Sequence, residues 1–439
     1  MADPAVIPGR LDEWVARQRW FPGLAADATE TAATLPLSED GTVRTLLLRD
    51  ATPGAEAVYQ VPVVAADDGG LLDGPRTRAY VEALLRLLFD GGTARGDEAT
   101  AHGVRIGWEG PAPALVDARV LSGEQSNTSI IVDARRADGT AVGLMVKVFR
   151  ALHDGENPDV VLQSAISEAG SRRVPETYGA VVGSWPDARV EGGVAHGHLA
   201  VAQEFLADTR DAWRVALDAA RAGEDFTAPA RDLGAATAEV HAVLAQALPT
   251  ADADETSRAA LLRSMRARAA SAAALVPSVA AVEGPVAAVL AAGADGPWPA
   301  LQRIHGDYHL GQVLQVPGRG WVLLDFEGEP LRPMAERNEP DLALRDVAGM
   351  LRSFDYVAGT IAQEGGDAEA ARAWSDAARS AFLAGYEAGI GTSLAPWSTL
   401  LAALELDKAL YECVYEARNR PTWLPIPELA VHRLLEAVA

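Results

Sequence analysis

Three polar side chains near residue 310 have the types and the spacing that phosphoryl transfer needs. Asp307 lies in the segment RIHGDYHLGQVL, Gln312 follows five residues later, and Asp325 comes 18 residues after Asp307 in VLLDFEGEP. A carboxylate can accept the proton of a hydroxyl group, and carboxylate and amide oxygens are the hard ligands that Mg²⁺ prefers. We therefore predict that Asp307 is a general base and that Gln312 and Asp325 bind Mg²⁺.

This arrangement matches the catalytic pattern of protein kinases, which combines a catalytic-loop Asp, an Asn and the Asp of Asp-Phe-Gly. Here Gln312 stands in place of the Asn, and the third element reads Asp325-Phe326-Glu327. The two histidines beside the base, His305 and His309, are ambiguous. Either could contact the substrate or hold the loop through a structural hydrogen bond, and we include His309 among the candidate substrate contacts.

Only two of the 38 basic residues, Lys147 and Lys408, are lysines. A compact ammonium and a planar guanidinium are not interchangeable, so both positions are candidate functional sites unless two lysines remain by chance. Lys147 lies in the strand-like run LMVKVFR, and kinases need a strand lysine that holds the α- and β-phosphates and pairs with a helix carboxylate. We predict that Glu168, on the following helix, is this partner, and Glu156 is the alternative.

Two polar stretches complete a predicted nucleotide site. The segment SGEQSNTS at 122–129 is neither a GxGxxG loop nor a Walker A loop. Its small polar residues, among them Ser126, Asn127 and Thr128, can still offer N–H and hydroxyl groups to phosphate oxygens. The strand that ends at Glu204 to Leu206 falls where a kinase hinge binds adenine through backbone groups.

The second lysine lies on a predicted helix that has one polar face. Helical spacing puts four side chains on that face: Lys408, Tyr411, Glu412 and Tyr415. Charged groups can bind sugar hydroxyls, and tyrosine rings can pack on the C–H face of a sugar. We therefore predict a sugar site here, although an ordinary solvated Lys–Glu pair would give the same spacing.

The elements that position these groups change character along the chain. Residues 1–92 are typical of a small α+β unit, 93–206 of a β-rich N-lobe that binds nucleotide, and 207–439 of a helical C-lobe with the catalytic loop and sugar site. We expect an α+β, bilobal, protein-kinase-like fold with a ligand cleft between the lobes. The cluster RQRWF at 17–21 is either a binding element or a corner where arginine and aromatic side chains pack.

Composition excludes several classes of protein. The net charge of −23 and the pI near 4.7 argue against nucleic acid or an anionic membrane as the main partner. One cysteine, Cys413, excludes an intrachain disulfide framework and metal binding through paired cysteines. Because no signal peptide and no uninterrupted apolar run of about 18 residues stands out, we expect a cytoplasmic protein.

Taken together, these stretches resemble the bacterial maltokinases, which share the fold of aminoglycoside and choline phosphotransferases. The matching segments cover nearly the whole chain: RQRWF, SGEQSNTS, the strand with Lys147, QEFL, HGDYHLGQVL, LDFEGEP, LRDVAGMLRSFDY and DKALYECVYEARNRPTWLPIP. The chain departs from the family after RQRWF, where Pro22–Asp27 replace a segment that usually contains Gly and Lys. This departure concerns the cap and not the predicted active site.

The resemblance implies an N-terminal cap, an intermediate domain that completes the N-lobe, and a helical C-lobe. It implies that ATP and Mg²⁺ are used to phosphorylate maltose at its anomeric hydroxyl, so that maltose 1-phosphate made from trehalose feeds glycogen or α-glucan synthesis. It also places the sugar contacts on the helix of Lys408, and trehalose synthase is a possible partner of the cap. The alternatives are a kinase of another sugar such as glucosamine, an aminoglycoside phosphotransferase, and a catalytically dead ATP-binding scaffold. The mixed charge of the Lys408 face favours a neutral sugar over a polycationic aminoglycoside.

Overall fold

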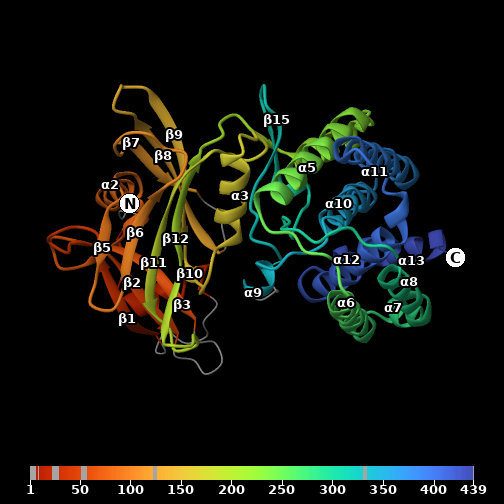
Figure 1. Ribbon diagram of the computed structural model, residues 1–439, viewed down its shortest axis with the longest axis horizontal. Helices are drawn as coiled ribbons and strands as arrows, with labels where there is room; N and C mark the ends of the chain where they lie inside the picture. The colour runs from red at the N-terminus through yellow and green to blue at the C-terminus, as the bar shows by residue number, and fades with distance from the viewer. Residues whose placement is uncertain are drawn as a thin grey trace. The chain divides into compact units, whose positions relative to one another are not determined.

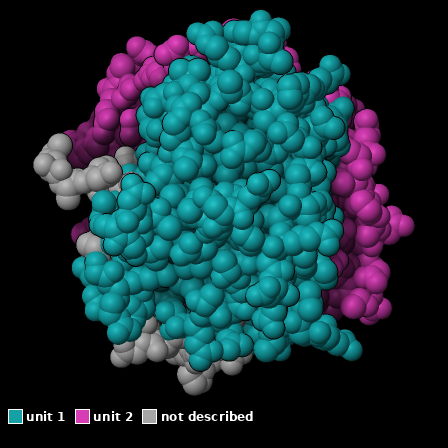
Figure 2. Space-filling view, turned by 90° about the vertical axis from the view of Figure 1, so that its left-hand side faces the viewer, with its two compact units in different colours: residues 1–168, 175–207 teal, residues 169–174, 208–439 magenta. Residues whose placement is uncertain are grey.

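The computed structural model describes residues 6–7, 9–21, 29–50, 57–121, 126–329 and 334–438. The chain divides into two compact units, which Figure 2 shows in different colours. Unit 1 holds residues 1–168 and 175–207, and unit 2 holds 169–174 and 208–439. Unit 1 thus contains both parts that the sequence analysis separates as cap and N-lobe, so the three-part division stays a prediction. The α+β class is confirmed, because unit 1 is rich in strands and unit 2 is mainly helical (Figure 1).

The first sheet of unit 1 is antiparallel and five-stranded, with the order β1-β2-β3-β10 and β4 paired to β3. Its strands are β1 (Thr29–Pro36), β2 (Val43–Asp50), β3 (Val58–Ala65), β4 (Leu71–Asp73) and β10 (Ala151–Leu152). The short helix α1 (Leu11–Val15) precedes the sheet in the chain. Trp20 and Phe21 of the RQRWF cluster are buried and pack their rings on Tyr59, which supports the packing interpretation of that cluster.

The second sheet of unit 1 has seven antiparallel strands in the order β5-β6-β11-β12-β9-β8-β7. The strands are β5 (Thr93–Arg95), β6 (Thr100–Arg105), β7 (Ala114–Val120), β8 (Asn127–Arg135), β9 (Ala141–Phe149), β11 (Thr177–Pro186) and β12 (Val194–Glu204). Besides α1, this unit contains the helices α2 (Arg78–Asp90) and α3 (Pro158–Glu168). Apolar side chains from α2 and from both sheets form one buried cluster, so the β-rich unit has a continuous core.

A buried arginine ties the two sheets of unit 1 together. Arg150 follows β9, and its side chain is 2% exposed. Its guanidinium donates to Thr128 Oγ1 at 2.8 Å and to the Gln60 carbonyl at 3.2 Å, and lies over the Trp20 ring. Asp73 lies 3.7 Å from it, and burial raises the pKa of this carboxyl, although Arg150 and Arg76 oppose the shift. The strand that carries Lys147 is therefore fixed to the first sheet through buried polar contacts.

Unit 2 contains a small antiparallel sheet, β13-β14-β15, and is otherwise mainly helical (Figure 1). The strands are β13 (Arg210–Asp211), β14 (Val313–Val316) and β15 (Gly320–Leu323). The α-helices are α4 (Ala212–Ala222), α5 (Thr227–Ala247), α6 (Glu255–Leu275), α7 (Pro277–Ala280), α8 (Glu283–Asp295), α9 (Met334–Arg337), α10 (Leu344–Gln363), α11 (Ala368–Ile390), α12 (Ser398–Asn419) and α13 (Pro425–Val438). Within the described ranges, no helix has the length and the apolar character that a membrane span requires.

We expect Arg150→Met to destabilise the protein by about 3–5 kcal/mol, because the buried Asp73 carboxylate keeps only the partly exposed Arg76 as a cationic partner and the buried bonds to Thr128 and Gln60 are lost. Arg49→Met is the matched control, since Arg49 forms an exposed ion pair with Glu30 and should change the free energy of unfolding little. Denaturant unfolding of both variants measures the difference. Equal losses in the two variants would contradict the role assigned to Arg150.

Candidate active site

The catalytic loop between α8 and β14 is held by one buried carboxylate. Asp346, in the first turn of α10, accepts the backbone N–H groups of His305 and Gly306 at 2.9 Å each. His241 of α5 lies 2.9 Å from the same carboxylate and is held in turn by the Tyr386 hydroxyl. Burial would raise the pKa of Asp346, but the hydrogen bonds and the nearby imidazoles hold it below its ordinary value. Asp346 is thus an anion that fixes the backbone just before Asp307.

His305 joins the catalytic loop to the loop that follows β15. Its Nε2 lies 2.8 Å from the Leu324 carbonyl, and its ring stacks on Phe326 with centroids 4.5 Å apart. The two loops also approach closely at Gly306 and Gly328, where a Cβ on Gly306 would lie 3.1 Å from the Gly328 Cα. Gly306 has φ +84°, a conformation that favours glycine. His305 is therefore structural, which is one of the two roles its sequence position allowed.

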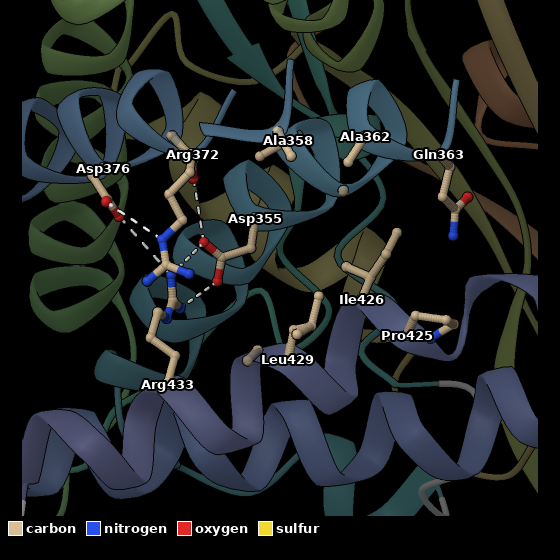
Figure 3. A pocket seen from close by; sticks show the side chains of 14 residues that line it. Asp355, Ala358, Ala362, Gln363, Arg372, Asp376, Pro425, Ile426, Leu429 and Arg433 are labelled. Carbon is tan, nitrogen blue, oxygen red and sulfur yellow. Dashed lines mark hydrogen bonds and ion pairs between the residues drawn. The ribbon is translucent and has the colours of Figure 1, made fainter. Parts of the chain in front are cut away.

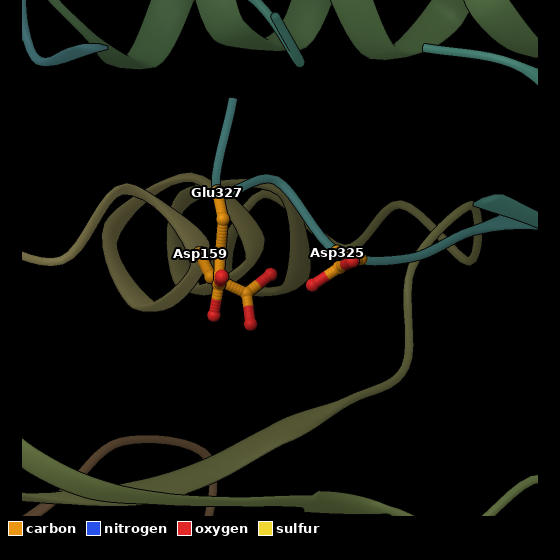
Figure 4. A group of neighbouring side chains, drawn as sticks. All are labelled: Asp159, Asp325 and Glu327. Carbon is orange, nitrogen blue, oxygen red and sulfur yellow. The ribbon is translucent and has the colours of Figure 1, made fainter. Parts of the chain in front are cut away.

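Gln312 and Asp325, the predicted metal ligands, lie side by side. Gln312 ends the 3-10 helix η3 (Leu310–Gln312), and its Nε2 donates to Asp325 Oδ2 at 2.9 Å. Because the Gln312 nitrogen makes this bond, the oxygen of the same amide points in another direction. Asp325 has φ +63°, one of only two non-glycine residues with positive φ in the described part of the chain. Backbone strain of this kind is common at functional sites. Figure 4 shows Asp325 and Glu327 on the loop that follows β15.

Lys408 is held between two carboxylates. Its ammonium lies 3.1 Å from Asp307 Oδ1 and 2.9 Å from Glu329 Oε1, and its side chain is 19% exposed. Burial opposes the charge, but the two carboxylates outweigh it and raise the pKa of Lys408 above its ordinary value. The same ammonium lowers the pKa of Glu329 to about 2, against the effect of burial. Lys408 is therefore not a solvated partner of Glu412, and it directly contacts the predicted base.

A pocket of about 470 Å³ opens beside Asp307 within unit 2. Six predicted residues line it: Asp307, His309, Lys408, Tyr411, Glu412 and Tyr415. Burial lowers the pKa of His309, and its Nδ1 accepts the Gly311 N–H at 3.0 Å. The structure thus brings the predicted base and the whole predicted sugar set to one cavity.

Each carboxylate that lines this pocket is ion-paired with a cation of unit 2. Asp307 pairs with Lys408, Glu412 with Arg352 at 2.8 Å, and Glu416 with Arg420 at 2.6 Å. The Tyr356 hydroxyl also donates to Glu416 at 3.0 Å. Burial raises the pKa of Glu412, and Arg352 offsets this only in part. Each lining carboxylate therefore has a cationic partner, although Glu329 shares Lys408 and Asp355 shares Arg352.

A charged network behind the pocket supports Glu412. Asp355 of α10 forms ion pairs with Arg352, Arg379 and Arg433. Glu405 forms ion pairs with Arg379 and Arg433. Figure 3 shows Asp355 and Arg433 facing one another at the wall of a second cavity of about 390 Å³, which is lined by α10, α11 and α13. Because Arg352 bonds both Asp355 and Glu412, the position of Glu412 depends on this network.

Lys147 forms a different ion pair from the one that the sequence suggested. Its ammonium lies 3.0 Å from Asp159 Oδ2, in the first turn of α3, whereas Glu168 is exposed at the other end of that helix. Asp159 is nearly fully buried and also accepts Gln163 Nε2. The predicted helix is correct, but the carboxylate of that helix that pairs with Lys147 is Asp159 and not Glu168, and the Glu156 alternative stays a prediction. The helix dipole stabilises the negative charge of Asp159, which lies in the first turn of α3. It destabilises a negative charge at the C-terminal end, where Glu168 lies.

The remaining predicted nucleotide contacts have mixed surroundings. Residues 122–125 of the polar stretch lie outside the described residues, Ser126 is exposed, and Asn127 is buried. Thr128 is also buried, and its hydroxyl oxygen accepts a hydrogen bond from Arg150, so its side chain makes a structural contact in the interior of unit 1. Glu204 ends β12, where its N–H donates to the Glu176 carbonyl at 2.8 Å, and Leu206 is half-buried two residues later. The Pro22–Asp27 departure also lies outside the described residues.

The sequence analysis left the roles of several residues unassigned. Among them are Asp346 and Arg352 behind the site, and Trp213, Tyr356, Glu416 and Arg420 in the pocket wall. Helical spacing offered one signal, because Gly349, Ser353 and Tyr356 share a face of α10 and all line the pocket. Trp213 gave no such signal, since its position depends on how α4 packs.

Comparison with known proteins agrees with this geometry. Residues 194–397 match the phosphotransferase enzyme family, and residues 14–78 match the maltokinase N-terminal cap domain. A glucosamine kinase of Mycolicibacterium smegmatis is 33% identical over 342 residues, which cover 72% of this chain and 79% of the relative. A glucosamine kinase of Streptacidiphilus jiangxiensis is 29% identical over 434 residues, covering 92% of this chain and 90% of the relative.

Structural similarity extends over nearly the whole chain. A glucosamine kinase solved in complex with glucosamine, ADP and inorganic phosphate has a TM-score of 0.71 and 25% identity, and covers 98% of this chain and 100% of its own. The expected kinase-like fold is thereby confirmed. The chain belongs to the phosphotransferase enzyme family, as a sugar kinase with a maltokinase-type N-terminal cap domain.

Proposed function

We propose that this protein transfers the γ-phosphoryl group of ATP to the anomeric hydroxyl of maltose. The observation that carries this proposal is the pocket beside Asp307, whose three lining carboxylates are all ion-paired and whose walls hold five aromatic side chains. These are Trp213, Tyr356, Tyr411, Tyr415 and Trp423. Aromatic rings pack on the C–H faces of sugars, and paired charges offer hydrogen bonds without attracting a cation. Both properties suit a neutral sugar with more than one ring.

Glucosamine is the second candidate, because two relatives carry that activity in their names. Its protonated amine would gain most from a carboxylate that lacks a cationic partner, and the pocket's three carboxylates have partners. The match to the maltokinase cap domain also supports maltose. Maltose 1-phosphate as a precursor of α-glucans, docking of trehalose synthase on the cap, and a cytoplasmic location stay predictions.

In the proposed reaction Asp307 accepts the proton of the anomeric hydroxyl. The oxygen forms a bond to the γ-phosphorus while the bond from that phosphorus to the bridging oxygen breaks, so ADP leaves with that electron pair. Lys147, held by Asp159, binds the α- and β-phosphates. The Glu204 carbonyl and the Leu206 backbone contact adenine, since the Glu204 N–H already donates to the Glu176 carbonyl.

The donor set of unit 2 fits Mg²⁺. Asp325 offers a carboxylate, and the Gln312 amide offers its oxygen because its nitrogen already donates to Asp325. When bound, the ion would neutralise charge that develops on the transferred phosphoryl group. The left-handed backbone at Asp325 fixes the direction in which this carboxylate leaves the loop.

We expect Asp307→Asn to lower kcat with maltose by about 10²–10⁴-fold, because the amide keeps the shape of the side chain but cannot take the proton. ATP affinity should stay within about twofold, since Asp307 lies in the sugar pocket. ADP release measures the first quantity and calorimetric titration the second. Asp117→Asn, an exposed change in β7, is the control. Near-normal turnover by Asp307→Asn would remove Asp307 from the role of base.

Asp325→Asn should raise the Mg²⁺ concentration needed for half-maximal activity by about 10–100-fold, because a charged ligand is lost. The KM for maltose should change little, since Asp325 does not line the sugar pocket. Titration of ADP release with Mg²⁺ gives both values. A rise in the maltose KM alone would mean that Asp325 acts on the sugar and not on the ion.

We expect the wild-type protein to have a kcat/KM for maltose at least about tenfold higher than for glucosamine, which corresponds to 1.4 kcal/mol. Arg420→Gln should narrow this ratio by several-fold, because it leaves the Glu416 carboxylate without its guanidinium and so favours an ammonium group. Arg420→Lys keeps the charge and should keep the ratio. Preference of the wild type for glucosamine would overturn maltose in favour of the second candidate.

A further inference from the structure

We propose that Lys408 is a positioning residue for the phosphoryl-transfer reaction, one that holds Asp307 and Glu329 as a pair of like charges around a single ammonium. This inference rests on the proposed function, in which Asp307 is the base. It gives the second lysine a role that differs from a sugar contact. The role is electrostatic and geometric, so it can be separated from sugar binding by experiment.

The geometry places one cation between two anions from different segments. Asp307 belongs to the catalytic loop, Glu329 to the loop after β15, and Lys408 to the middle of α12. The ammonium bonds a single oxygen of Asp307, Oδ1, which leaves Oδ2 as the oxygen that can face the acceptor hydroxyl. The Tyr411 ring lies 4.9 Å from the ammonium and covers one side of it.

Other charged and titratable groups surround this trio on every packed element. They are His309 of the catalytic loop, Asp407, Tyr411 and Glu412 of α12, Arg268 of α6 and Arg345 of α10. Arg268 and Arg345 are both bonded to Asp407, at 2.8 and 3.4 Å. The cations beyond Glu329 are therefore committed to another carboxylate, and Lys408 is the cation in contact with both Asp307 and Glu329.

Removing the ammonium would leave two carboxylates facing one site without a cation between them. Two neighbouring carboxylates resist double ionisation, and the pKa of one rises strongly. At neutral pH a proton shared by this pair would remove the base. A guanidinium is a poor substitute, because its planar fork differs in shape from a compact ammonium that two single oxygens approach. This accounts for a lysine at 408 in a chain that otherwise uses arginine at 36 of its 38 basic positions.

The test uses three variants of the full chain: Lys408→Met, Glu329→Gln and the double variant. In Lys408→Met the acid limb of the pH profile of kcat/KM should move up by about one pH unit or more, with kcat at pH 7 lowered by at least about tenfold. In Glu329→Gln the limb should not move up, because Lys408 still contacts Asp307. In the double variant the limb should move back down from its position in Lys408→Met, because Asp307 no longer has a like-charged neighbour, but should stay above wild type because the ammonium is also lost.

Two other outcomes would overturn the proposal. A sugar contact at Lys408 would raise the maltose KM in Lys408→Met and in the double variant while the acid limb stayed in place. A purely structural role would lower the melting temperature and the active fraction in both, again with no movement of the limb and no recovery in the double variant. Melting curves and ATP binding of each variant check that the fold is intact.

A direct titration makes the result independent of turnover. Carbon-13 NMR of the side-chain carboxyls, with Asp307 and Glu329 assigned from the Asp307→Asn and Glu329→Gln spectra, reports their ionisation without any sugar. In Lys408→Met one of the two should titrate at least about one unit higher than in the wild type. Unchanged titration would refute the inference even in an active enzyme. If no sugar were phosphorylated, the proposed function would fail while this titration still decided the role of Lys408.

Discussion

The site in unit 2 depends on one buried carboxylate, Asp346. Its two oxygens bind the backbone of His305 and Gly306, and the loop they fix carries Asp307 one residue further on. Such a charge is stable in the interior only because every nearby partner is a donor. A catalytic loop is irregular backbone without a ladder of its own, so this anchor replaces the hydrogen bonds that a helix or strand would have supplied.

The same helix ties the loop to the sugar pocket. Asp346 begins α10, and along that helix Arg352 reaches Glu412 while Gly349, Ser353 and Tyr356 line the pocket. Ser353 also accepts the N–H of Leu310, two helical turns from Asp346. One helix therefore sets the distance between Asp307, the proposed base, and the wall of the proposed sugar pocket. Rigid positioning of this kind is what allows a carboxylate to act at hydrogen-bond distance from a hydroxyl.

The predictable part of the site is the part that is local in sequence. Gln312 and Asp325 are brought together by one tight hairpin, β14 and β15, and Asp307 lies only five residues before Gln312. The face of α12 was readable for the same reason, because helical period alone groups its side chains. The packed architecture of unit 1 was less accessible, since Arg150 unites residues from Trp20 to Thr128 that no local pattern connects.

The error at Lys147 shows where such reasoning ends. Sequence spacing identified the helix that follows the strand, but not which end of that helix meets the lysine. Asp159 lies at the N-terminal end and Glu168 at the other, so the answer depends on packing and on the helix dipole rather than on distance along the chain. The partners of Lys408 were missed for a related reason, because Asp307 and Glu329 reach α12 from loops that lie 101 and 79 residues away in sequence.

The two lysines show how a rare residue type can indicate a constraint before the structure is known. Both ammonium groups are mostly buried and both contact a carboxylate at about 3 Å, Lys147 through Asp159 and Lys408 through Asp307 and Glu329. In a protein with a net charge of −23, the overall field attracts an exposed lysine and an exposed arginine alike. This field therefore does not explain why lysine occurs at these two positions. What separates these two positions is that single oxygens approach a compact donor there, a geometry that a bidentate guanidinium does not match.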